Sequence, residues 1–194
     1  MFLLEDPIFI DIIIKMKPTK LSSSSLFIIC LCLMSYAVVP ALGLKLYEEL
    51  CSEARKYSQD CLDLLKGDDQ IVASINYQEL SVNILDLSIK EATSYQKYLG
   101  GKTKEFPNDQ AVKKCANQFL IGTLASFVSS LRHLIAKNLQ SSISDAQTAT
   151  SGADNCDKAI QNEKPEFDPQ PIHTRNNEMF LLGVISVLAI NHLT

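Results

Sequence analysis

The residues that decide the fold run from Ile71 to Gly101 and read IVASINYQELSVNILDLSIKEATSYQKYLGG. Apolar side chains recur in this stretch at alternating spacings of four and three residues. Because an α-helix has about 3.6 residues per turn, this spacing places them in one stripe on one face. The stripe contains Ile71, Ile75, Val82, Leu85, Ile89, Ala92 and Leu99. We therefore expect one long amphipathic helix, which ends at Gly100 and Gly101.

A second long helix is expected after a loop at residues 106–109. Its apolar stripe contains Ala116, Leu120, Leu124, Phe127, Leu131 and Leu134. A break is expected near residues 138–141. Ser142 and Asp145 then have the spacing of a capping box, which predicts a shorter helix that runs to about Ser151 and ends at Gly152.

Two short amphipathic segments, Leu46–Tyr57 and Ser58–Leu65, precede the first long helix. Asp68 or Asp69 is the expected N-cap after them. At the other end, a proline-containing linker over residues 162–174 leads to a final apolar helix, Asn176–Leu193. The apolar run of that helix is shorter than the roughly 20 residues that span a bilayer. The pattern predicts an all-α protein, an antiparallel four-helix bundle with an N-terminal α-helical hairpin.

The N-terminal residues 1–43 read as an extension followed by a secretory signal peptide. Lys17 and Lys20 precede an apolar run at residues 26–39, and small residues follow at 40–43. Translation is expected to start at Met16, because acidic residues interrupt the apolar residues before it. Cleavage after Gly43 would leave the domain 44–194; an uncleaved signal-anchor is the alternative.

Four cysteines remain after cleavage, and an even number in a secreted chain predicts disulfides. Cys51 and Cys61 are ten positions apart, which suits a short helical hairpin. The helix that starts at Cys115 runs outward for about 33 Å. The return to Cys156 covers about 28 Å if the chain is extended after Gly152. Geometry therefore favours the pairs 51–61 and 115–156, with a non-helical approach to Cys156.

Several function classes are disfavoured by the sequence. A formal net charge of −4 gives no reason to expect a nucleic-acid partner. No G-x-S-x-G, P-loop, G-x-G-x-x-G or H-E-x-x-H motif is present. The cysteines lack the short gaps that structural zinc sites use, and His133 reads as a surface residue. We expect a binding protein that is not an enzyme and that needs no metal or cofactor.

The order of these features resembles the plant invertase and pectin methylesterase inhibitor family over residues 44–194. The features are the hairpin closed by Cys51 and Cys61, the sequence Lys-Lys-Cys-Ala at 113–116, the partner Cys156, and a final apolar helix preceded by Arg-Asn-Asn at 175–177. The resemblance implies a four-helix bundle with the cysteine pairing favoured above. It implies a secreted protein of the apoplast, or of the vacuole, that is not membrane-bound when mature. It also implies stoichiometric inhibition of a plant invertase (β-fructofuranosidase) or of a pectin methylesterase.

Lys164, Pro165, Glu166 and Phe167 are the target-enzyme contacts that the resemblance suggests. Invertase inhibitors of the family have a Pro-Lys-Phe loop that enters the active site. Pro165 and Phe167 match that loop and tilt the prediction toward invertase, but Glu166 would be repelled by the carboxylates of a glycosidase. A structural linker is the plainer interpretation.

Two other functions stay open at this point. The first is inhibition of pectin methylesterase specifically, through polar residues on the helix after Ser142, such as Asp145, Gln147 and Thr148. The second is a structural or regulatory role without inhibition, because a shared fold does not fix function.

We expect the secreted protein to begin at Leu44. N-terminal sequencing of protein purified from the medium of a eukaryotic host that expresses the full chain checks this. An N-terminus upstream of Leu26 would rule out the predicted cleavage.

Overall fold

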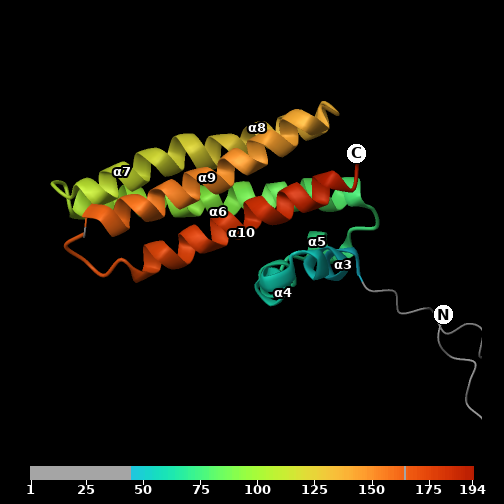
Figure 1. Cartoon of the computed structure of the whole chain (residues 1–194), viewed down its shortest axis with the longest axis horizontal. Coiled ribbons are helices and arrows are strands. Elements are labelled where there is room, and N and C mark those ends of the chain that lie inside the picture. Colours follow the sequence, from blue (N-terminus) through green and yellow to red (C-terminus); the bar gives the residue numbers. More distant parts are fainter. Residues whose placement is uncertain (1–44, 164) are drawn as a thin grey trace, which may run out of the picture. The chain divides into compact units, whose positions relative to one another are not determined.

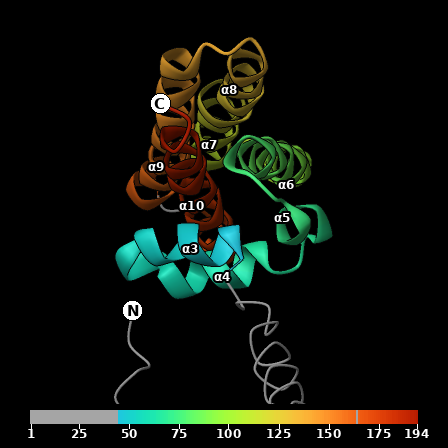
Figure 2. The ribbon, with the colours of Figure 1, turned by 90° about the vertical axis from the view of Figure 1, so that its right-hand side faces the viewer.

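The computed structural model describes residues 45–163 and 165–194, which belong to one unit, Leu44–Thr194. The predicted signal peptide, the start at Met16 and Lys164 lie outside the described residues. In the described part of the chain, four long helical runs lie side by side and a helical hairpin lies next to the last of them (Figures 1 and 2). The long runs are α6 (Tyr77–Glu105), α7 with η2 and α8 (Gln110–Ile135), α9 (Leu139–Glu163) and α10 (Gln170–Asn191).

The hairpin consists of α3 (Leu46–Glu53), the 3₁₀ turn η1 (Arg55–Tyr57) and α4 (Ser58–Leu65). A disulfide joins Cys51 to Cys61, whose Cα atoms are 5.5 Å apart. Both cysteines are fully buried, as are Leu50 and Leu65. Tyr57 meets Phe180 of α10 edge to face at 6.1 Å. The hairpin predicted from the sequence is therefore present, and its apolar side packs against the bundle.

The first long helix starts later than predicted. Asp68 caps a short helix, α5 (Asp69–Ala73), by accepting hydrogen bonds from the next turn. The chain then breaks, and Asn76 Oδ1 accepts from the Glu79 amide at 2.9 Å to start α6. Ile75, which the predicted stripe placed in the core, is 84% exposed. Asn76 has an extended backbone and its side chain satisfies a free amide in the first turn of α6, so it caps a new helix and does not continue the preceding one.

Gly100 and Gly101 do not end the helix, which was the second wrong prediction for this segment. Neither has a positive φ, and α6 continues for one more turn to Glu105. A glycine inside a helix costs about 1 kcal/mol relative to alanine, which is a modest amount. The extra turn places Lys102 and Phe106 next to the loop before α10, where both contact the ring of Phe167.

The second long run is helical from Gln110 to Ile135 but contains a π-helix. Asp109 caps α7 (Gln110–Gln118), η2 (Phe119–Leu124) is the π-helical segment, and α8 (Ala125–Ile135) follows. The run ends in a tight turn in which Lys137 has a φ of 60°. The amides of Lys137 and Asn138 donate to carbonyls of the last turn, which is the Schellman arrangement.

The helix α9 begins at Leu139 and passes through Gly152 and Cys156 without a break. The predicted capping box is wrong, because Ser142 lies inside α9 and bonds to Ser130 of α8. The predicted non-helical approach to Cys156 is also wrong. The earlier start at Leu139 gives the return path about 26 Å of helix against about 30 Å outward, so no extended segment is needed. The disulfide joins Cys115 to Cys156, with the Cα atoms 4.0 Å apart.

Gly152 serves close helix packing. A Cβ atom added there would lie 2.6 Å from the Thr123 amide nitrogen, and one added at Gly122 would lie 2.9 Å from the Gly152 Cα. The backbones of η2 and α9 are therefore in direct contact. The Thr123 hydroxyl donates to the Ala149 carbonyl at 3.1 Å across the same contact. We call this contact, together with the Cys115–Cys156 disulfide, the seam.

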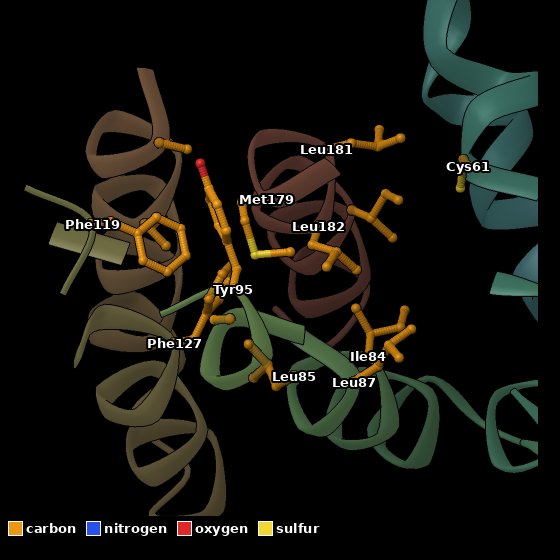
Figure 3. Packing of buried hydrophobic residues seen from close by; sticks show 14 of the residues in the cluster. Cys61, Ile84, Leu85, Leu87, Tyr95, Phe119, Phe127, Met179, Leu181 and Leu182 are labelled. Atoms are coloured by element: carbon orange, nitrogen blue, oxygen red, sulfur yellow. The ribbon is translucent and has the colours of Figure 1, made fainter. Parts of the chain in front are cut away.

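The last helix, α10, begins at Gln170, six residues before the predicted start at Asn176. Pro171 lies in its first turn, where a missing amide hydrogen costs nothing. The helix packs against α9 and α6, and buried side chains from α6, η2, α8 and α10 meet between them (Figure 3). In the described part of the chain, no helix is both long and apolar enough to cross a membrane.

We expect Gly152→Ala to destabilise the protein by about 1–3 kcal/mol, because the new methyl group overlaps the backbone of η2. Gly101→Ala is the matched control: a Cβ there meets nothing within 4 Å, so this variant should gain about 0.5–1 kcal/mol. Urea denaturation of both variants measures the difference. Equal changes in the free energy of unfolding for the two variants would contradict the close backbone contact between η2 and α9.

Candidate functional site

Residues 165–169, the predicted contact loop, lie at the end of the bundle where α6 ends, α7 begins and α9 leads into α10 (Figure 1). Pro165 and Phe167 are half-buried, whereas Glu166 is exposed. Of the three predicted contact residues that the structure describes, Glu166 is the most exposed; Lys164 lies outside the described residues.

Phe167 is held by the bundle. Its ring stacks on Phe106 with the ring centroids 4.9 Å apart. The Lys102 ammonium nitrogen lies 5.3 Å from each of these two ring centroids, within cation–π range. Lys102 also donates to Glu105 at 2.8 Å, and this hydrogen bond raises the pKa of Lys102. The aromatic residue of the loop is thus engaged in contacts within the protein.

The backbone of the loop is fixed at both ends by carboxylates. The Glu166 amide donates to Asp109 Oδ2 at 3.2 Å, while Asp109 Oδ1 accepts from Val112 and caps α7. The Asp168 carboxylate accepts from the Gln170 amide at 3.0 Å at the start of α10. These bonds leave the Glu166 side chain as an anionic group on a held loop.

A buried polar network secures α10 beneath the loop. The Tyr95 hydroxyl donates to Asn176 Oδ1 at 2.9 Å and lies 3.8 Å from Cys156 Sγ of the disulfide. Asn176 Nδ2 donates to Asp157 Oδ1 at 3.4 Å, and His173 Nδ1 also contacts that oxygen. Burial raises the pKa of Tyr95 well above its usual range, so the hydroxyl stays protonated and able to donate.

Sequence reasoning missed this network. It noted Arg-Asn-Asn at 175–177 only as a signal for the last helix. A polar Asn176 on the apolar side of a helix was the available signal, because a buried amide needs hydrogen-bond partners. Its partners lie on α6 and α9, and the sequence alone does not identify them.

A second candidate surface is the exposed face of α9, which we call the α9 polar face. Beside the exposed ion pair of Asp154 and Lys158, this face carries uncharged hydrogen-bonding side chains about one turn apart. They are Ser144, Gln147, Thr148, Ser151 and Asn155. The Thr148 hydroxyl donates to the Ser144 carbonyl at 3.0 Å and the Ser151 hydroxyl to the Gln147 carbonyl at 3.3 Å. Each of these hydroxyl oxygens can therefore still accept a hydrogen bond from a partner.

The sequence suggests three polar residues of this helix as pectin methylesterase contacts, and two of them, Gln147 and Thr148, are exposed. Asp145 is half-buried, and its Oδ2 lies 3.7 Å from Nε2 of His133 on α8. Asp145 therefore faces the neighbouring helix more than it faces solvent. Within the described ranges, no group of three His, Cys, Asp or Glu residues is placed to hold a metal ion.

Two solved structures have a similar fold. One is a mutant form A of a pectin methylesterase inhibitor from Arabidopsis, with 20% identity and a TM-score of 0.61; the match covers 70% of this chain and 89% of that one. The other is a pectin methylesterase inhibitor from Arabidopsis thaliana, with 18% identity and a TM-score of 0.57, over 79% of this chain and 99% of that one. No protein-family model and no curated protein matches the sequence. The fold that the sequence resemblance implied is confirmed by these structures.

Tyr95→Phe should destabilise the protein by about 1–3 kcal/mol, because it leaves the buried Asn176 without its donor. Tyr98→Phe is the control: Tyr98 is half-buried on the same helix and makes no side-chain hydrogen bond within the described residues. Denaturant midpoints of the two variants give the measurement. A Tyr95→Phe protein as stable as Tyr98→Phe would show that the network does not secure α10.

Proposed function

We propose that this protein is a secreted, non-enzymatic inhibitor that binds a plant pectin methylesterase. The observation that carries the proposal is the fold shared with two solved pectin methylesterase inhibitors, which extends over nearly the whole of both structures. The match to one of them covers 99% of its length, so this chain contains the whole scaffold.

The state of the loop favours pectin methylesterase over invertase as the target. A loop that enters an active site needs a side chain free to enter. Here Phe167 is stacked on Phe106 with the Lys102 ammonium over its ring, and the exposed residues of the described part of the loop include the anions Glu166 and Asp168. A glycosidase site carries catalytic carboxylates, which would repel Glu166.

The α9 polar face is the surface we assign to the enzyme contact. An enzyme cleft that binds a polysaccharide offers many hydrogen-bond partners for hydroxyl groups. A row of hydroxyl and amide side chains can form hydrogen bonds with those groups of the enzyme without burying an unpaired charge. The seam holds the backbone of α9 on the buried side of the helix, so little backbone freedom is lost on binding.

Secretion to the apoplast, or to the vacuole, fits the two disulfides. Such bonds persist in oxidising compartments, and here both are fully buried. The signal peptide predicted from the sequence belongs to the same proposal.

The test is a titration of the purified protein against a plant pectin methylesterase and a plant acid invertase in parallel. We expect loss of pectin methylesterase activity at near-stoichiometric ratios, no loss of invertase activity, and no turnover of sucrose or methylated pectin by the protein alone. Loss of neither activity, with both disulfides formed, would overturn the proposed function.

The contact surface is tested with Thr148→Arg, which should weaken inhibition at least about tenfold, or about 1.4 kcal/mol. Thr93→Arg is the control. Thr93 is also exposed on a long helix and also bonds to the carbonyl four residues before it, at 2.7 Å. Equal inhibition by the two variants would show that the α9 polar face does not contact the enzyme.

Invertase inhibition is the second candidate, because Pro165 and Phe167 match the loop of the invertase inhibitors. Glu166→Lys completes that loop and leaves the bundle unchanged, since Glu166 is exposed. Inhibition of invertase by the unmodified protein would favour this candidate. If the Glu166→Lys variant inhibits invertase and the unmodified protein does not, Glu166 is the residue that excludes invertase.

A further inference from the structure

Two turns of the described chain share an unusual backbone feature. Arg55, with a φ of 53°, and Lys137, with a φ of 60°, are the two non-glycine residues with positive φ between Lys45 and Thr194, residue 164 aside. Both are basic and exposed, and both lie just after the end of a helix. Side chains other than glycine are strained in this region, by roughly 1–2 kcal/mol. Each turn also lies within a disulfide loop, 51–61 or 115–156.

At the first turn the basic residue has a basic neighbour. Lys56 follows Arg55 and is also exposed, and the two begin the 3₁₀ segment η1. Endoproteases need a recognised side chain and a locally opened backbone that fits their cleft. An exposed pair of basic residues in a strained turn supplies the side chains, and the relief of strain favours the opening.

We propose that the Arg55–Lys56 bond is a processing site for an endoprotease specific for basic residues. Water adds across this peptide bond: the Arg55 carbonyl carbon gains the hydroxyl and becomes a carboxylate, and the Lys56 nitrogen leaves as an amine that takes up a proton. The product is a two-chain protein, because the disulfide between Cys51 and Cys61 still joins the segments on either side.

The bundle keeps its structure after this cleavage. The segment before the cut still presents Tyr47, Leu50 and Cys51 to the core, where all three are buried. The cut does place a new carboxylate at the C-terminal end of α3 and a new ammonium at the N-terminal end of α4. Both charges have the unfavourable sign for the helix dipole. Cleavage therefore loosens the hairpin and leaves the four-helix bundle in place.

The turn at Lys137 is the natural comparison. It has a similar φ and is also exposed. Both turns carry backbone hydrogen bonds: the Asn138 amide donates to the His133 carbonyl at 2.8 Å, and the Tyr57 amide donates to the Ala54 carbonyl at 3.1 Å. The two turns differ in the helix that follows, which has 25 residues in α9 against 8 in α4. Opening this turn breaks more structure, so we expect cleavage there to be slower.

The test is limited digestion with trypsin under native conditions, on oxidised protein purified from a secreting eukaryotic host that expresses the full chain. Among the Lys and Arg residues of the secreted protein, the first cut should fall after Arg55, at least about tenfold faster than after Lys137. Non-reducing electrophoresis should show one species, and reduction should release the N-terminal segment.

The double variant Arg55→Gln, Lys56→Gln should lose the first cut, whereas Lys137→Gln should keep it. The molecular mass of the untreated secreted protein, measured after its disulfides are reduced, shows whether the host has already made the cut. A first cut elsewhere would overturn the proposal, as would release of the N-terminal segment without reduction. Circular dichroism of the cut protein should retain the helical signal; loss of that signal would also contradict the proposal.

Discussion

The backbones of η2 and α9 lie in direct contact at Gly122 and Gly152, and the Cys115–Cys156 disulfide holds the same two runs together. A side chain at Gly152 would not fit, so this contact sets the distance between the two helices. Gly183 of α10 also approaches α9, since a Cβ there would lie 2.4 Å from the Thr150 methyl carbon and 3.2 Å from the Ala146 carbonyl oxygen. The helix α9 is thus held from two sides at backbone distance, and the other helices pack around it.

Both candidate contact regions depend on this placement. The α9 polar face is the side of the helix that the seam leaves uncovered, and residues 165–169 leave from the end of the same helix. The network of Tyr95, Asn176 and Asp157 lies beside the disulfide and ties α6 and α10 to α9. A partner that binds either region therefore meets a surface already ordered by the core, which lowers the entropic cost of binding.

The sequence predicts what is decided locally. The hairpin, the cap at Asp68 and the all-α class follow from spacing and composition, and the cysteine pairs favoured by geometry are the pairs that the structure joins. The failures concern residues whose role depends on distant neighbours. Gly152 reads as a helix end, yet it packs against a segment about 30 residues away in the chain. Ser142 reads as a cap, yet it bonds to Ser130. Likewise, nothing local in the sequence shows that Phe106 stacks on Phe167 and leaves it only half-exposed.

Amide hydrogen exchange across residues 149–157 tests the central claim most directly. If α9 runs unbroken through Gly152 to the disulfide at Cys156, these amides exchange slowly and with similar protection, as expected for a packed helix interior. If the helix ends at Gly152, the amides of residues 153–156 exchange fast while those before Gly152 stay protected. We predict the first result, and the second would contradict the unbroken, tightly held α9.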